Sequence, residues 1–232
     1  MSGKKRKKPE MVDAYDDQMN YIGAYPRTYV HRHRMWHKVV QCWVFSQDKD
    51  SGSVTIYLQR RSFEKRSHPG RYDITAGGHV SAGETPKEAV VRETLEETGL
   101  ALDEERLLYI GQFREKVGND CEMAYIYAYE MKNPPFKPGS EVIYMVSADL
   151  DEFMDLVNKK RKSITVTPAI RTGLMHEEAF TISKGNCSLH KSFTYKVYPY
   201  LKKLIGGRGE TSKKSGESSE TSKKSGESGE NR

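Results

Sequence analysis

The sequence predicts an α/β/α sandwich with a mixed β-sheet, on the strength of two observations. Short runs of β-branched and aromatic residues alternate with helical patterns in the order strand, strand, loop, helix, hairpin, strand, helix. The central helix also has a start signal and a stop signal in the chain. In 232 residues, this order favours one domain with helices on both faces of a sheet, flanked by tails.

The elements before the central helix are short. Scattered aromatic residues and a turn at 16–20 predict N-terminal strands that pack on the main domain, within residues 11–29. A polar turn at 48–53 joins two strand-like runs into a hairpin, and residues 60–70 form a basic loop. The strands predicted in this part are Lys38–Phe45, Val54–Gln59 and Tyr72–Ala76.

The central helix begins after Thr85 and ends before Gly99. The Thr85 hydroxyl can cap the free backbone N–H groups of the first turn, and Pro86 is pre-organised for the first helical position. Gly99 suits the left-handed residue that follows a helix. The two signals therefore place a helix of about three turns in the middle of the chain.

Three carboxylates share one face of this helix. Glu93, Glu96 and Glu97 stand at i, i+3 and i+4, so their Cβ atoms lie within about 6 Å and their charges repel one another. Hard cations such as Mg²⁺ prefer oxygen ligands of this kind, together with substrate phosphates and water. A solvated surface face is the simpler interpretation of the acids alone, but the surrounding residues favour a cation site.

Strand patterns return after Gly99. A hairpin turn at 118–120 joins two of the strands predicted here, which are Leu107–Val117, Cys121–Met131 and Val142–Val146. Helical spacing predicts a helix at Leu150–Lys160. Further helices are expected at Thr167–Phe180 and, interrupted by Pro199, at Ser192–Leu204. Three tyrosines repeat at period two on one strand, where they either pack in the sheet or line a ligand pocket: Tyr125, Tyr127 and Tyr129.

Residues 78–100 resemble the Nudix box, the motif G-x5-E-x7-R-E-U-x-E-E-x-G-U in which U is bulky and apolar. The matching residues are Gly78, Glu84, Arg92, Glu93, Glu96, Glu97, Gly99 and Leu100. Thr94 departs from the motif at the first U, although its methyl group can still face the core. The chain is thereby identified as a member of the Nudix hydrolase superfamily, with the domain expected at 11–205.

The resemblance implies hydrolysis of a diphosphate bond with Mg²⁺, or with Mn²⁺ in its place. The metal ligands that it implies are Glu93, Glu96, Glu97 and the backbone carbonyl of Gly77 or Gly78. Arg92 and Glu84 are expected to pair with each other and brace the loop against the helix. Glu141 is the candidate for a further catalytic acid, and the choice of the base among the glutamates stays open.

The flanking stretches resemble a narrower branch, the Nudix proteins similar to isopentenyl-diphosphate isomerase. The residues that carry this resemblance lie at 12–16, 36–43, 58–62 and 68–73. An isomerase uses a cysteine just ahead of the loop to pass a proton to the alkene, and residues 73–79 contain none. A hydrolase is therefore favoured, with an isomerase and a non-catalytic nucleotide- or RNA-binding module as the alternatives.

The substrate side is less well defined by the sequence. Arg34, Trp36, Arg60 and His79 are the candidates for contacts with phosphate or a base. Histidines at 31, 33 and 37 suggest a metal site, but their spacing fits no standard ligand set and neighbouring arginines oppose a cation. The expected substrate is a nucleoside diphosphate-linked molecule or a related organic diphosphate, with the attached moiety and the oligomeric state undetermined.

Charge and composition restrict the partners. Of the net charge of +6, residues 1–10 supply +4 and residues 206–232 supply +1, so a nearly neutral body argues against a broad nucleic-acid surface. Lys4–Lys8 is a nuclear localisation patch, an RNA contact or a solvated tail. Residues 206–232 hold two near-identical decamers and are expected to be disordered. Three separated cysteines and the lack of a long apolar run predict a cytoplasmic protein with no membrane partner.

Overall fold

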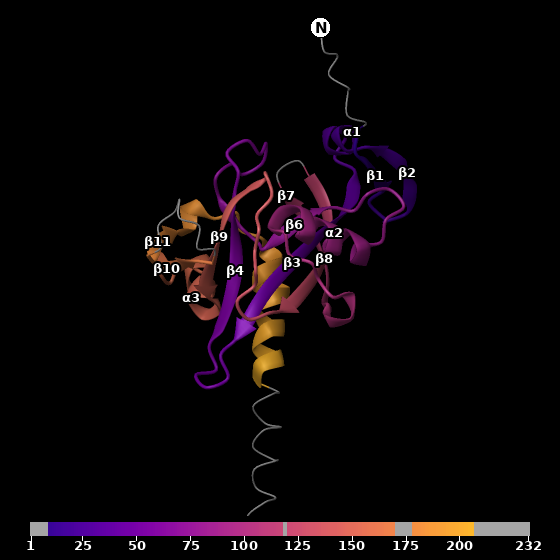
Figure 1. The fold of residues 1–232 in the computed structure, drawn as a ribbon. Helices are drawn as coiled ribbons and strands as arrows, with labels where there is room; N and C mark the ends of the chain where they lie inside the picture. Colours follow the sequence, from indigo (N-terminus) through magenta and orange to yellow (C-terminus); the bar gives the residue numbers. More distant parts are fainter. Residues whose placement is uncertain (1–8, 118–119, 170–177, 207–232) are drawn as a thin grey trace, which may run out of the picture.

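The computed structural model describes residues 9–117, 120–169 and 178–206, which form a mixed sheet of eleven strands (Figure 1). Its strands are β1 (Met11–Tyr15), β2 (Tyr21–Pro26), β3 (Trp36–Gln47), β4 (Val54–Arg61), β5 (Tyr72–Asp73), β6 (Ala76–His79), β7 (Leu108–Val117), β8 (Asp120–Glu130), β9 (Val142–Asp149), β10 (Ser163–Pro168) and β11 (Phe180–Ser183). The strand β8 runs parallel to β3, whereas β4 and β6 pair with β3 antiparallel.

The long strand β3 lies at the centre of the sheet. The main path runs β11-β10-β9-β4-β3-β1-β2, while β6 and β8 also pair with β3 and β7 continues from β8. A strand covered on both faces needs apolar residues in an unbroken run rather than in alternation. The segment Val39–Phe45 is buried throughout, and all of its residues except Gln41 are apolar. The predicted hairpin of β3 and β4 is confirmed.

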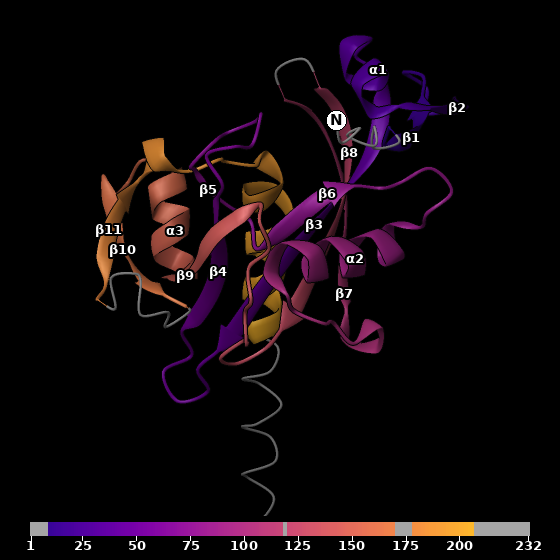
Figure 2. The ribbon, with the colours of Figure 1, turned by 45° about the horizontal axis from the view of Figure 1, so that its top comes forward.

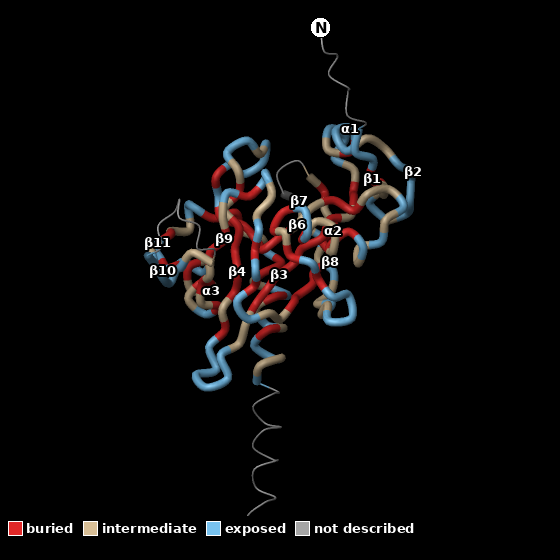
Figure 3. Tube along the Cα trace, viewed as in Figure 1, coloured by how far each residue is buried: buried red, intermediate tan, exposed pale blue. Residues whose placement is uncertain are grey.

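Helices cover both faces of the sheet, so the predicted α/β/α sandwich is confirmed. Helix α2 (Pro86–Thr98) packs through Ala89 and Val90 on one face of β3. Helix α3 (Leu150–Val157) and the helical segment 191–206 pack on the other face, where the rings of Trp43 and Phe193 lie 5.0 Å apart. Figure 2 shows α2 and the yellow C-terminal segment on either side of β3, and Figure 3 shows the sheet buried between them.

The start and stop signals of α2 act as predicted. Thr85 accepts a hydrogen bond from the Glu88 N–H in a capping box, and Gly99 ends the helix at φ 68°. A Cβ on Gly99 would lie 2.4 Å from the Lys137 carbonyl oxygen, so the close approach of that loop also requires glycine. Thr94 is fully buried and its hydroxyl donates to the Val90 carbonyl at 2.7 Å, which explains why the core tolerates it.

Two parts of the fold differ from the sequence prediction. The short helix α1 (Arg27–Arg32) lies inside the N-terminal segment, where strands alone were expected. The helix expected at Thr167–Phe180 is wrong at both ends, because β10 and β11 occupy them. The cause begins just upstream of Thr167. The buried Ile164 and Val166 alternate with the exposed residues Ser163, Thr165 and Thr167, which is the pattern of a strand. Residues 170–177 of that expected helix are outside the described residues.

The C-terminal helix is present with an irregular first half. The described residues 191–206 are helical, and Phe193–Val197 adopts π-helical geometry. Pro199 lies two residues after this segment, and a proline within a helix removes one N–H donor and crowds the preceding turn. The predicted basic tail and the predicted disorder of the C-terminal decamers fall on 1–8 and 207–232, outside the described residues. None of the described helices has the length and apolar character to cross a membrane.

Candidate active site

Two glycines of β6 bring the backbone of the sheet against the acidic face of α2. The Gly77 N–H donates to Oε2 of Glu97 at 3.0 Å. A Cβ on Gly78 would lie 2.2 Å from the Cδ atom of Glu93 and 2.4 Å from both of its carboxylate oxygens. Any side chain at 78 would therefore collide with Glu93, so glycine is required for the carboxylate to reach the strand.

The carboxylate of Glu97 lies in the interior of the protein, with 2% of the residue exposed. Gln59 on β4 donates to its Oε2 at 2.9 Å, and the Lys65 ammonium lies 3.7 Å from its Oε1. Burial raises the pKa of Glu97 to about 7 in spite of these partners. Burial also raises the pKa of Glu93, while Glu96 stands at the outer edge of the cluster with 60% of its side chain exposed.

Arg92 holds the loop against the helix, as predicted. Its Nε and Nη2 atoms donate to the two oxygens of Glu84, each at 2.8 Å, and Nη2 also donates to the His79 carbonyl at 3.0 Å. Nη1 donates to Glu93 at 2.7 Å and reaches Glu96 at 3.4 Å. The planar guanidinium thus joins the loop, β6 and two of the acidic side chains, which a lysine could not do.

The loop residue Glu141 comes close to the acidic cluster through Lys65. The Lys65 ammonium pairs with the Glu141 carboxylate as well as with Glu97. The Ser62 N–H donates to the Glu141 carbonyl at 2.8 Å, which fastens the basic loop 60–70 to the start of β9. Glu141 therefore lies where the sequence placed a further acid, and its part in catalysis stays a prediction.

Sequence reasoning missed Gln59 and the individual role of Lys65. The alternating pattern of the sequence placed Gln59 on a strand. Nothing in the neighbouring residues indicated that its side chain would contact a carboxylate. The signal that was available is a polar residue directly after the apolar pair Tyr57 and Leu58 on one strand. Lys65 belongs to the loop 60–70, which the sequence identified as basic. Spacing alone did not predict which basic side chain of this loop would lie beside Glu97.

The substrate-side candidates are spread over the fold. Trp36 is buried, its Nε1 donates to Asp17 at 2.9 Å, and the Arg114 guanidinium lies 4.4 Å above its ring, so its faces are taken up within the protein. Arg34 lies exposed in the turn after α1, with φ 53°. Within the described residues, no hydrogen bond or ion pair joins either side chain to the acidic cluster. Their role in substrate binding stays a prediction.

Arg60 and His79 occupy positions beside the site. Arg60 follows Gln59 on β4, so its side chain points away from Glu97 and lies 4.6 Å from the ring of Tyr72. The backbone of His79 accepts from Arg92, whereas its imidazole is 8% exposed and lies 2.9 Å from the His31 imidazole, nitrogen to nitrogen. Neither side chain touches the carboxylates, and their contact with substrate stays a prediction.

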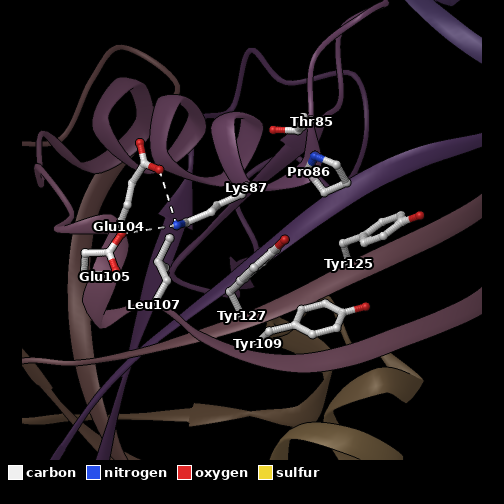
Figure 4. A pocket seen from close by; sticks show the side chains of 9 residues that line it. All are labelled: Thr85, Pro86, Lys87, Glu104, Glu105, Leu107, Tyr109, Tyr125 and Tyr127. Atoms are coloured by element: carbon white, nitrogen blue, oxygen red, sulfur yellow. Dashed lines mark ion pairs between the residues drawn. The ribbon is translucent and has the colours of Figure 1, made fainter.

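A separate hollow of about 460 Å³ lies beside the N-terminus of α2 (Figure 4). Tyr125 and Tyr127 of β8 line it together with Tyr109 of β7, whose ring lies 5.3 Å from that of Tyr127. Tyr129 is buried. Two of the three alternating tyrosines therefore line a hollow, at the end of α2 opposite to Glu97.

The carboxylates suit a divalent metal ion. Glu93 and Glu97 carry negative charge in a buried setting, and the raised pKa of each shows that neighbouring cations do not compensate burial fully. The side-chain oxygen of Gln59 is buried and has no hydrogen-bond partner among the described residues. An oxygen-rich donor set of this kind fits a hard cation such as Mg²⁺, held by Glu93 and Glu97 with Glu96 at the rim.

The fold and the site define a hydrolase of diphosphate bonds. One buried and one half-buried carboxylate on a helix, Glu97 and Glu93, face a glycine loop that an arginine–glutamate pair braces against that helix. The NUDIX domain family matches residues 35–165, more than half of the chain, and the protein belongs to this family.

Similar proteins agree with this assignment. An uncharacterised Nudix hydrolase of Clostridium acetobutylicum is 26% identical over 197 residues, covering 81% of this chain and 94% of that protein. Isopentenyl-diphosphate Delta-isomerase of Cutibacterium acnes is 37% identical over 99 residues, or 42% of this chain and 47% of that protein. A crystal structure from Deinococcus radiodurans shares the fold with a TM-score of 0.50 and 20% identity, covering 65% of this chain and 89% of that one.

Proposed function

We propose that the protein hydrolyses a diphosphate bond in a nucleoside diphosphate-linked or related organic diphosphate, with Mg²⁺ as the metal. The observation that carries this proposal is the placement of Glu93 and Glu97 against Gly77 and Gly78, with the Lys65 ammonium beside them. Carboxylates for a metal and a cation for phosphate oxygens then lie within one site, as phosphoryl chemistry requires.

The side chains supply distinct parts of this chemistry. A bound divalent ion neutralises phosphate charge and makes water more acidic. Glu97 is the candidate for the general base, because it is buried beside the glycine loop and because Gln59 and the Gly77 N–H fix the position of its carboxylate. Lys65 provides a positive charge for a phosphate oxygen. Arg92 keeps Glu93 and the loop in position through its contacts with Glu84 and the His79 carbonyl.

The isomerase alternative is disfavoured by the surroundings of β6. Gly77 and Ala76 carry no group that transfers a proton. Cys42 pairs in register with Ala76, but its side chain is fully buried in the core below α2, and burial raises its thiol pKa to about 12. A thiol in that position stays protonated and cannot reach a substrate outside the core.

A substrate panel tests the proposal. Purified protein is incubated with Mg²⁺ and a series of nucleoside diphosphate derivatives and organic diphosphates, and released phosphate or mononucleotide is measured. Hydrolysis is expected for at least one compound, with Glu97→Gln lowering kcat at least about 100-fold because it removes the base. Glu105→Gln is the control, since 92% of the Glu105 side chain is exposed.

Three outcomes would contradict the proposal. Tight binding of a diphosphate without turnover would indicate a binding module. Interconversion of isopentenyl and dimethylallyl diphosphate, followed in the same samples, would indicate an isomerase despite the missing cysteine. Equal activity of Glu97→Gln and wild type would remove the carboxylate cluster from the mechanism.

A further inference from the structure

The basic loop 60–70 is closed by one arginine. Arg61 stands at the end of β4, and its guanidinium reaches across to the far side of the loop. Nε and Nη2 donate to the Ser67 carbonyl at 3.3 and 3.1 Å, and Nη2 also donates to the Ser67 hydroxyl at 3.2 Å. Lys65, whose ammonium lies 3.7 Å from Glu97, stands in the chain between these two residues. The placement of Lys65 beside the carboxylates therefore depends on how Arg61 holds the loop.

A buried carboxylate on β5 holds this arginine. Oδ2 of Asp73 accepts from Nη1 of Arg61 at 3.2 Å, and the two residues are 7% and 9% exposed. Oδ1 of Asp73 accepts from the Ile74 N–H at 2.8 Å and lies 2.7 Å from Nε2 of His190. A carboxylate oxygen only accepts, so this imidazole nitrogen carries a proton. A buried charge needs a donor at each oxygen, and His190 supplies one of them.

His190 comes from a part of the chain beyond the family match. The match ends at residue 165, whereas His190 lies in the C-terminal segment 187–192, just ahead of the last helix. This segment runs along the end of the basic loop, where the Ser188 N–H donates to the Tyr72 carbonyl at 2.7 Å. Backbone and side-chain contacts thus fasten a segment outside the matched residues to the loop that carries the cation of the site.

The other side of the imidazole is held by β3. Nδ1 of His190 lies 3.4 Å from the Gln41 amide nitrogen, and the Ser192 hydroxyl donates to the side-chain oxygen of Gln41 at 2.7 Å. Gln41 is 4% exposed, Ser192 is fully buried, and Gln41 pairs in register with Gly77. The ring is therefore fixed between the strand that pairs with the glycine loop and the carboxylate of Asp73, so its orientation is set from both sides.

We propose that His190 is a positioning residue for Lys65. Within the described parts of the chain, no hydrogen bond or ion pair joins His190 to the carboxylates of α2, so it acts through other residues. It orients the carboxylate of Asp73, which holds Arg61 and with it the loop that presents Lys65 to a phosphate oxygen. The inference rests on the proposed function, because Lys65 meets phosphate only when a diphosphate is bound. It makes the C-terminal segment a working part of the site.

Binding of methylenediphosphonate, a diphosphate analogue whose carbon bridge cannot be hydrolysed, tests this chain of contacts. Full-length protein is titrated with the analogue by calorimetry in excess Mg²⁺. Lys65→Ala should weaken binding by about 10- to 100-fold, because a charge-assisted hydrogen bond to phosphate is lost. His190→Ala should weaken it by about 10-fold, and the double variant should bind no more weakly than Lys65→Ala alone. His190→Gln should stay within about 2-fold of wild type, because its amide still donates to Asp73.

A second variant and a control separate positioning from a loss of stability. Asp73→Asn keeps the side-chain volume, but both partners of this carboxylate donate and one amide cannot satisfy both, so binding should again weaken about 10-fold. Circular dichroism shows which variants are folded, and Asp73→Asn keeps the test valid if His190→Ala unfolds. The matched control is Tyr198→Phe, since the Tyr198 hydroxyl joins the same C-terminal segment to Asp151 of α3 at 2.8 Å. It should bind the analogue as wild type does.

Four results would overturn the inference. They are unchanged binding by folded His190→Ala and Asp73→Asn, a double variant whose loss is the product of the two single losses, an equal loss in Tyr198→Phe, and no recovery in His190→Gln. The readout is binding, so the proposed function can fail separately. If no diphosphate of the panel is hydrolysed but binding follows the expected pattern, His190 still positions Lys65. No binding of the analogue by wild type would contradict both.

Discussion

Replacement of Gly78 by alanine probes the contact between β6 and α2 most directly. The added Cβ would stand 2.2 Å from the Cδ atom of Glu93. Carbon atoms of neighbouring groups normally remain about 3.5 Å apart or more, so one of the two must move by about 1.3 Å. A displacement of about 1 Å in a catalytic group costs on the order of 100-fold in rate. We therefore expect kcat/KM of Gly78→Ala to fall about 100-fold on the best substrate of the panel.

The measurement separates a local clash from general destabilisation. Steady-state rates are compared with the unfolding midpoint in urea, where overpacking should cost about 1–3 kcal/mol. Gly185→Ala is the control, since the nearest atom to its Cβ, Oγ of Ser183, is 3.8 Å away. Gly78→Ala combined with Glu93→Asp should regain stability, because the shorter acid withdraws from the strand. A fully active Gly78→Ala enzyme, or a double variant no more stable than Gly78→Ala, would refute the reasoning.

Three further predictions concern charges around the site. Arg92→Lys should destabilise the fold by about 1.5–3 kcal/mol in urea unfolding, because a lysine cannot make the paired hydrogen bonds to Glu84; an unchanged midpoint would contradict this. Burial acts to lower the pKa of His190, but the Asp73 carboxylate, 2.7 Å from its Nε2, raises it overall. Wild type should therefore lose stability as pH rises above the ordinary histidine value of 6.5, and His190→Gln should not show this loss. In chelator, Lys65→Ala should lose more stability than wild type between about pH 6 and pH 8, because the buried carboxylate beside it loses its cation; parallel pH curves would contradict this.

The local signals of the sequence predicted the centre of the fold well. Thr85, Pro86 and Gly99 act within a few residues of one another, so helix ends can be derived from their types alone. The spacing of Glu93 and Glu97 likewise followed from helical geometry. The sequence did not predict which of the acids would be buried. Their burial depends on the packing of β4 and the basic loop over Glu97, which leaves Glu96 exposed at the rim.

The errors arose where long-range packing decides the outcome. The helix expected at Thr167–Phe180 begins inside β10, whose residues form a strand because β10 pairs with β9 and β11. The histidines at 31, 33 and 37 were judged by their spacing along the chain. Their geometry is set instead by α1 folding back on β3, which brings in His79 from a strand more than forty residues away and leaves His33 outside.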